Sequence, residues 1–208
     1  MTATKKGTKR TYNVHPGIAR YEWILTTMKE KTGRSFDEWL KIVEQQGPAS
    51  AKERSAWLRA THGLGGNSAD YIAERSVGKG VDLDRAVYLK TAEEYVEKMY
   101  SGAKTGLRPL YEALLDLGLS LGKDVRVCPC QTIVPLYRNH VFAQIKPSTK
   151  TRVDFGLALK DTKAPARLID TGGFAKKDRI THRIEITALA DIDDEVKRWV
   201  KIAYDKDA

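Results

Sequence analysis

The chain has 208 residues, of which 41% are hydrophobic and 30% are charged, and its formal net charge is +9. No apolar run approaches the roughly 20 residues that cross a bilayer as a helix, and no apolar core follows the basic start MTATKKGTKR, as a secretory signal requires. The two cysteines, Cys128 and Cys130, are too close in sequence for an unstrained disulfide. These features argue against a membrane-spanning or secreted protein and predict a reduced, cytoplasmic one of one or two domains.

The positive charge is concentrated in two parts of the chain. Residues 1–10 carry four basic and no acidic side chains, and residues 126–183 carry 12 basic and 4 acidic ones. The remaining segments are neutral or acidic. A local excess of this kind is typical of a protein that binds a polyanion, although it is equally typical of basic residues that only keep a small sheet soluble.

The first half of the chain has helical periodicity. Residues 1–15 are polar and basic and predict a disordered tail. Residues 16–79 predict a helical module of four short helices, which are expected to begin at Pro16, at the N-caps Ser35 and Ser50, and at Asn67 or Ser68. The inward helical positions of this module and of the last helix include all four tryptophans: Trp23, Trp39, Trp57 and Trp199.

The second half changes from a period of 3.6 to a period of 2. Residues 80–106 predict a connecting helix and a hinge at Gly102 and Gly106. Residues 107–208 predict an α+β domain, in which a helix, an antiparallel sheet and a final helix follow one another. Strands are expected at 124–128, 132–138, 140–146, 151–159 and 180–187, with a loop over 160–179, and Pro135 indicates an edge strand or a bulge.

Two longer strings resemble known families. EKTGRSFDEWLKIVEQQGP with AWLRATHGLGGNSADYI resembles a small bacterial helical module of unknown function. FAQIKPSTKTRVDFGLAL with THRIEI and RWVKIAYDKDA resembles a second uncharacterised bacterial domain, which is often fused after the first. The resemblance implies a two-domain protein and supplies no activity.

The stretch HGLGGNSADYI at 62–72 resembles the hairpin of helix-hairpin-helix DNA-binding modules. Its candidate phosphate contacts are the backbone N–H groups of Gly63, Gly65 and Gly66, which precede a helix N-terminus. A C-capping glycine followed by an Asn or Ser N-cap explains the same residues without a ligand. We therefore expect a turn between helices, with a DNA contact as the alternative.

The stronger candidate site is basic and lies in the C-terminal domain. Its predicted polyanion contacts are Lys146, Ser148, Thr149, Lys150, Arg152, Lys176, Lys177, Arg179 and Arg183. Arg152 and Arg183 have the solvent-side parity of their strands. A charged hairpin turn with no ligand is the competing interpretation.

Two kinds of chemistry are weakly indicated and are not expected. Cys128-Pro-Cys130 with His140 and His182 lacks the usual spacing of zinc ligands, so we expect no metal and no cofactor. Asp154, Glu185 and Lys146 could share a sheet face, as in a metal-dependent nuclease, but no motif fixes them, and surface ion pairs have the same composition.

The sequence therefore predicts a non-enzymatic nucleic-acid-binding protein, with a possible protein partner for the helical module and with no membrane contact. The alternative is a small-ligand or protein-binding module with no role in binding nucleic acid.

Overall fold

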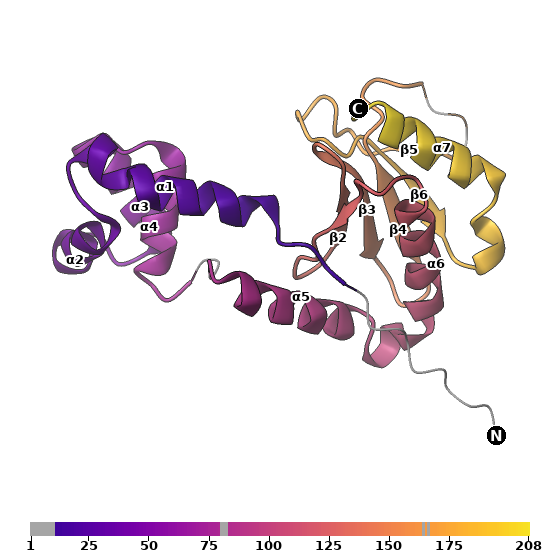
Figure 1. Ribbon diagram of the computed structural model, residues 1–208, viewed down its shortest axis with the longest axis horizontal. Helices are drawn as coiled ribbons and strands as arrows, with labels where there is room; N and C mark the ends of the chain where they lie inside the picture. The colour runs from indigo at the N-terminus through magenta and orange to yellow at the C-terminus, as the bar shows by residue number, and fades with distance from the viewer. Residues whose placement is uncertain (1–10, 80–82, 164, 166) are drawn as a thin grey trace. The chain divides into compact units, whose positions relative to one another are not determined.

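The computed structural model describes residues 11–79, 83–163, 165 and 167–208 (Figure 1). They form two compact units, a helical unit over Val14–Tyr88 and a larger unit of residues 11–13 with Leu89–Ala208. The boundary between the units lies inside helix α5 (Arg85–Met99). The predicted fold class, a helical bundle followed by an α+β domain with an antiparallel sheet, is confirmed.

The helical unit is built from four short helices with well-defined ends. They are α1 (Pro16–Thr32), α2 (Phe36–Gln46), α3 (Ala51–His62) and α4 (Gly66–Arg75). Ser35 and Ser50 each close a capping box with the glutamate three residues later, as the sequence predicts. The fourth helix differs from the prediction, because its N-cap is Gly65 rather than Asn67 or Ser68, and no side chain caps it.

The prediction that all four tryptophans lie in a core is wrong for Trp23, which is 57% exposed. Ile24 supplies the buried position on this turn of α1. Because neighbouring helical residues point about 100° apart, Trp23 turns toward solvent, where the Nζ atom of Lys31 lies 3.6 Å from its ring centroid. The other tryptophans agree better with the prediction: Trp39 and Trp199 are buried, and Trp57 is half-buried and packs against the core.

The larger unit contains a six-stranded sheet in which every pair of neighbours is antiparallel. The strands are β1 (Arg126–Val127), β2 (Val134–Tyr137), β3 (Val141–Pro147), β4 (Val153–Leu157), β5 (Ile169–Asp170) and β6 (His182–Ile186). Their order in the sheet is β1-β2-β3-β4-β6-β5. A register shift at Leu136/Tyr137 confirms the bulge expected near Pro135, which lies in an inner strand. Strand β5 was not predicted, because two residues are too few to show an alternation of apolar and polar side chains.

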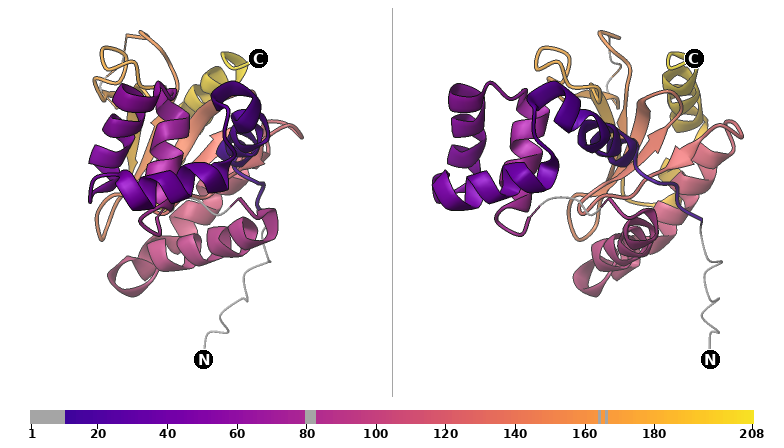
Figure 2. Two further views of the ribbon diagram at one scale, coloured as in Figure 1. Left: turned by 90° about the vertical axis from the view of Figure 1, so that its left-hand side faces the viewer. Right: turned by 60° about the vertical axis from the view of Figure 1, so that its left-hand side comes forward.

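Two helices cover one face of this sheet. Both α6 (Arg108–Leu119) and α7 (Asp194–Asp205) contact β3 and β4 (Figure 2). The strand side chains on the covered face are fully buried and include Ile145, Phe155 and Ile184. Most of the intervening residues are polar, so this unit has a polar sheet face, which includes Gln144, Lys146, Asp154, Arg183 and Glu185. Phe142 of β3 departs from this pattern and is fully buried.

Two short 3-10 helices lie in the described part of this unit. The expected hinge glycines, Gly102 and Gly106, lie in a 3-10 helix, η1 (Gly102–Leu107), and a second one, η2 (Leu189–Asp191), precedes α7. Residues 11–15 of the predicted tail are ordered: the hydroxyls of Tyr12 and Tyr111 lie 3.1 Å apart, and Asn13 pairs with Val127. Residues 1–10 lie outside the described residues. Within the described part of the chain, no helix has the length and apolar character to cross a membrane.

Candidate functional site

The end of β3 and the turn that leads to β4 carry five of the predicted polyanion contacts, and these five differ in exposure. Lys146, Thr149 and Lys150 are exposed, whereas Ser148 and Arg152 are half-buried. The Ser148 hydroxyl donates to Asp154 Oδ2 at 2.6 Å. Its hydrogen is therefore already used within the protein, and the exposed lysines are the free donors of this turn.

Arg152 and Arg183 belong to a compact ion-pair cluster on the polar sheet face, which we call the arginine–carboxylate cluster, of Arg152, Asp154, Arg183 and Glu185. The strand register places Asp154 directly opposite Glu185. Arg152 lies 2.9 Å from Asp154 and 2.8 Å from Glu185, and Arg183 lies 3.0 Å and 2.7 Å from the same two carboxylates. Two positive and two negative groups thus balance one another.

This pairing changes the interpretation of all four residues. Arginines that already bind two carboxylates each have little charge left for a phosphate. In turn, Asp154 and Glu185 both pair with arginine, which counts against a metal-dependent nuclease site, where they would hold a metal or activate water. A pair of carboxylates on a sheet face serves here as the partner of two arginines.

The remaining predicted contacts, Lys176, Lys177 and Arg179, lie at the other end of the strands. Arg179 Nε donates to the carbonyl of Val141, the first residue of β3, at 3.1 Å. Lys146 lies five residues further along β3, which is about 17 Å at the usual rise of a strand. The predicted basic residues therefore form two separate groups and cannot contact one phosphate together.

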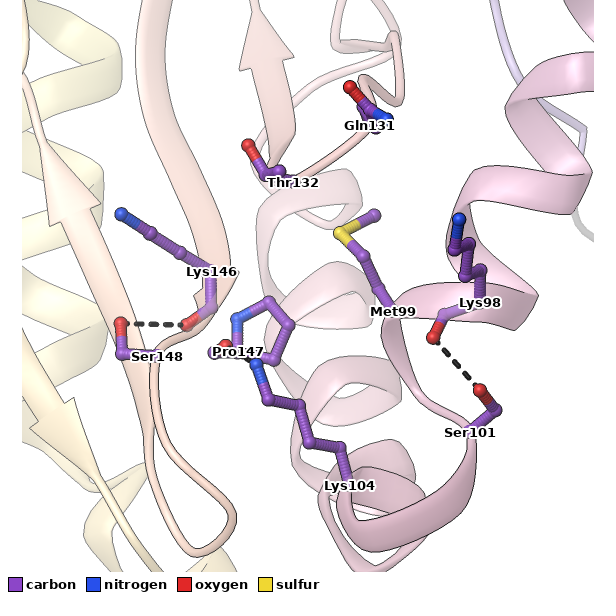
Figure 3. Close-up of a pocket in the computed structure, with 9 residues that line it drawn as sticks. All are labelled: Lys98, Met99, Ser101, Lys104, Gln131, Thr132, Lys146, Pro147 and Ser148. Atoms are coloured by element: carbon purple, nitrogen blue, oxygen red, sulfur yellow. Dashed lines mark hydrogen bonds between the residues drawn. The ribbon is translucent and has the colours of Figure 1, made fainter.

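One of these groups borders a pocket with an unusual lining, which we call the lysine pocket. It encloses about 570 Å³. Its lining side chains come from α5, η1, the loop before β2, and the end of β3 with the turn that follows it (Figure 3). They are Lys98, Met99, Ser101, Lys104, Gln131, Thr132, Lys146, Pro147 and Ser148. No carboxylate lines it. Within the described part of the chain, none of its three lysines forms an ion pair.

The lysines of this pocket are spread along its rim. Lys104 Nζ donates to the carbonyl of Pro147, which ties η1 to the end of β3. Figure 3 shows Lys98 and Lys104 on the helical side and Lys146 on the strand side, with its ammonium turned away from the other two. Positive charge therefore borders the pocket on both sides, an arrangement that suits an extended anion better than a single small one.

A second hollow, which we call the α7 pocket, encloses about 620 Å³ beside the end of α7. Its lining is Ala158, Lys160, Phe174, Ala175, Lys177, Asp178, Arg179, Thr181, Ala203, Lys206 and Asp207. It takes in Lys177 and Arg179 of the predicted contacts. Lys176 is exposed on the same loop.

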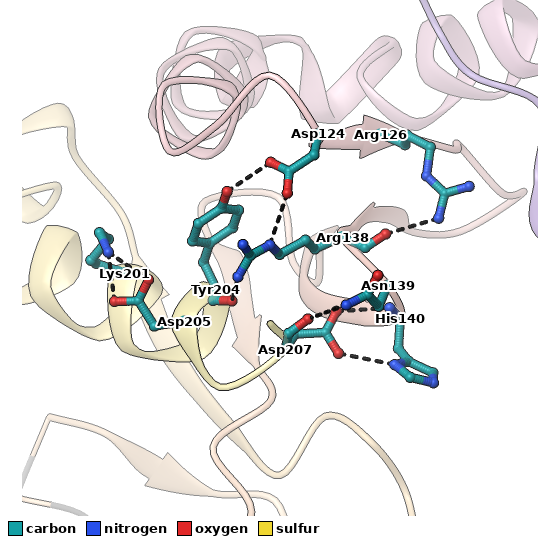
Figure 4. A network of polar contacts seen from close by, with 9 residues as sticks. All are labelled: Asp124, Arg126, Arg138, Asn139, His140, Lys201, Tyr204, Asp205 and Asp207. Atoms are coloured by element: carbon teal, nitrogen blue, oxygen red, sulfur yellow. Dashed lines mark hydrogen bonds and ion pairs between the residues drawn. The ribbon is translucent and has the colours of Figure 1, made fainter.

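Asp207 anchors one wall of the α7 pocket (Figure 4). Its side chain is only 4% exposed and accepts hydrogen bonds from Arg179, from the backbone N–H of His140 at 2.7 Å and from the His140 ring at 3.1 Å. Burial disfavours the charged form, but the hydrogen bonds from His140 and the charge of Arg179 outweigh it and lower the pKa of Asp207. Asn139 fixes the same turn by donating to the Asp207 carbonyl.

The α7 pocket also has unusual backbone geometry. Lys160 and Lys177 both have φ of 57°, and they are the only non-glycine residues with positive φ among those the structure describes. Left-handed backbone costs an ordinary residue about 1–2 kcal/mol, which glycine avoids. Two lysines are thus kept at positions that suit glycine.

We expect Lys160→Gly and Lys177→Gly each to raise the free energy of unfolding by about 0.5–1 kcal/mol, because relief of the backbone outweighs the greater chain entropy of glycine. Urea denaturation measures the change. The matched control is the neighbouring exposed Lys176, which lacks positive φ. There glycine is expected to lower stability, and the same sign at all three positions would contradict the argument.

The residues considered as zinc ligands do not form a metal-binding group among the described residues. Burial raises the pKa of the Cys128 thiol to about 12, and it also raises that of Cys130. His182 is buried with its Nδ1 atom 2.8 Å from the Thr181 hydroxyl, and His140 contacts Asp207. Among the described residues, no three metal-binding side chains form a group.

The glycine hairpin of the helical unit has the geometry of a helix-to-helix turn. Gly63 has φ of 66° and its N–H donates to the carbonyl of Arg59, so it caps the end of α3. Gly65 is the N-cap of α4 and Gly66 is its first residue. Asp70, which follows in α4, accepts a hydrogen bond from the buried Ser55. These contacts account for the hairpin without a bound phosphate. The alternative, a DNA contact through its backbone N–H groups, stays a prediction.

Comparison with known proteins divides the chain in two. The family model DUF5655, a domain of unknown function, matches residues 96–207, which is more than half of the chain. The chain belongs to this family. A second model, DUF4287, also a domain of unknown function, matches residues 21–75. No curated protein and no solved structure matches the chain.

Both pockets lie within the DUF5655 domain, and the two matches confirm the resemblance to two uncharacterised domains. Lys98 and Lys104 were not predicted as polyanion contacts, because they lie in the connecting helix and in the segment predicted as a hinge, outside the basic segment 126–183. A charge count cannot find them. Only the packing of η1 against the end of β3 brings them beside Lys146.

Proposed function

We propose that the DUF5655 domain binds an extended polyanion, and that nucleic acid is its natural class. The observation that carries the proposal is the lysine pocket, whose lining contains Lys98, Lys104 and Lys146 and, among the described residues, no carboxylate. Lys150 adds an exposed cation on the adjoining turn. The side chains of Gln131 and Thr132 offer polar contacts at the same rim.

The arrangement favours a backbone over a single phosphate. Ammonium groups on both sides of the rim and on the turn can follow successive phosphates, and each phosphate that a lysine neutralises releases counterions. Hydroxyls and amides position such a backbone without reading its sequence. The domain is proposed as a binding protein with no catalytic role. The cytoplasm, where cysteines such as Cys128 and Cys130 stay reduced, is its proposed location.

The test is fluorescence anisotropy of labelled single-stranded DNA, duplex DNA and RNA over a salt series. In the variant Lys98→Glu/Lys146→Glu/Lys150→Glu, we expect affinity at low salt to fall at least about 30-fold. The slope of log affinity against log salt concentration is expected to decrease in magnitude by the equivalent of about 2–3 phosphate contacts. Arg152 stays unchanged, because its loss would disturb the arginine–carboxylate cluster. Circular dichroism is the control that tests whether the variant remains folded.

The matched control places the same change of charge on the helical unit, at Lys41→Glu/Lys52→Glu/Lys79→Glu, where all three lysines are exposed. We expect this control to retain most of the affinity. Equal losses in both variants would show that net charge alone attracts the nucleic acid. No binding by the wild type at low salt would end the proposal.

A further inference from the structure

The α7 pocket has two walls of different chemistry. Phe174 is 58% exposed, and the half-buried Ala158 and the exposed Ala175 add apolar surface beside it, with the buried Ala203 behind them in the lining. An aromatic ring left in solvent beside small apolar side chains offers a flat surface for another ring. The volume of about 620 Å³ is within the range of small-molecule sites.

The charged wall is positive once its internal pair is set aside. Arg179 and Asp207 bind each other. This leaves three lysines, Lys160, Lys177 and Lys206, against the carboxylate of Asp178. Within the described part of the chain, these lysines form no ion pair. The net charge favours an anion and disfavours a cation, even one that would stack on Phe174.

The backbone provides an independent observation. Lys160 and Lys177 are the two non-glycine residues with positive φ among those described, and both line this one pocket. Unfavourable backbone that persists in a fold is commonly found where the side chain is used. The polar wall behind them is fixed, because Asp207 holds Arg179 and His140 together.

We propose that the α7 pocket binds a small aromatic anion, whose ring lies against Phe174 and whose phosphate or carboxylate contacts the lysine side chains. The apolar wall favours an apolar ring, and the ammonium groups favour an anionic group. A ligand with only one of the two would contact only part of the lining. This site is separate from the proposed polyanion site, since Arg179 and Lys146 lie at opposite ends of β3.

The test uses phenyl phosphate as the probe, with methyl phosphate and benzyl alcohol as its two halves, titrated into the full chain and followed by ¹⁵N-labelled NMR spectra. We expect phenyl phosphate to bind saturably, at least tenfold more tightly than either half, and to shift the amide signals of the loop around Phe174. Phe174→Ala is expected to weaken phenyl phosphate at least fivefold. Because this side chain is exposed, the variant keeps its fold.

Two further variants separate this site from the polyanion site. Lys177→Gly/Lys206→Gln is expected to weaken phenyl phosphate and leave benzyl alcohol unchanged, whereas Lys98→Glu/Lys146→Glu is expected to leave both unchanged. Phenyl phosphate that binds no better than methyl phosphate would overturn the proposal. So would binding that survives Phe174→Ala and disappears in Lys98→Glu/Lys146→Glu, which would place the phosphate in the lysine pocket.

Discussion

Replacing both arginines of the arginine–carboxylate cluster, as Arg152→Leu/Arg183→Leu, is expected to lower the free energy of unfolding by about 4 kcal/mol. The Asp154 side chain is only 16% exposed. The same two arginines are the counter-ions of both Asp154 and Glu185. Without them, two facing carboxylates remain on adjacent strands with no arginine partner, and Lys146, opposite Asp154 on β3, is the nearest cation in the strand register. Urea denaturation followed by circular dichroism measures the loss.

The two single variants show whether the four residues act as one unit. Either remaining arginine contacts both carboxylates, so we expect each single replacement to cost only about 1–2 kcal/mol and the double to exceed their sum. Adding Asp154→Asn/Glu185→Gln to the double variant is expected to restore much of the stability. Lys150→Leu on the adjoining turn is the control, with a change within about 0.5 kcal/mol. Additive losses without rescue would indicate that only the packing of the arginine side chains matters.

Asp207→Ala is expected to lower the free energy of unfolding by about 2–3 kcal/mol, because it leaves the His140 N–H and the Arg179 guanidinium without their acceptor. Asp205, on the last turn of α7, supplies the matched control, since it is exposed and, among the described residues, its side chain pairs with Lys201 alone (Figure 4). Asp205→Ala is expected to change stability by less than about 0.5 kcal/mol. Equal effects of the two substitutions would contradict the assignment of Asp207 as an anchor.

The same residue gives the stability a defined dependence on pH. The pKa of Asp207 in the folded protein lies below its ordinary value of 3.8. Its contribution is therefore complete above that value and is lost as the pH falls through the lower folded pKa. As the pH is lowered from about 6 to about 2, the melting temperature is expected to fall less in Asp207→Asn than in the wild type. Parallel curves would show that the folded and unfolded pKa values of Asp207 are the same.

Local signals predicted much of this fold. The capping boxes at Ser35 and Ser50 and the alternation of apolar residues in β3, β4 and β6 depend on neighbours in sequence, and the structure confirms them. Trp23 shows the limit of such signals. Its position is compatible with a broad apolar face, and only the packing of α1 decides that Ile24 is inside and the tryptophan is outside.

The candidate site was less predictable because charge has no periodicity that reveals its partner. The parity of Arg152 and Arg183 correctly placed them on the polar sheet face, but the pairing of β4 with β6 decides that carboxylates meet them there. Lys98 lies about 50 residues before Lys146 in the chain and joins it only through the packing of η1. Partners that are distant in sequence are set by topology, which the pattern of a single segment does not contain.

The two outermost strands of the sheet, β1 and β5, have two residues each, whereas the four between them have four to seven. Exposed strand edges offer unpaired N–H and carbonyl groups to which another chain can add a strand. A two-residue edge supplies too few such groups to hold a foreign strand in register. The DUF5655 sheet is thus protected at both margins against edge-to-edge aggregation, although its central strands are rich in the branched and aromatic residues that amyloid-forming segments share.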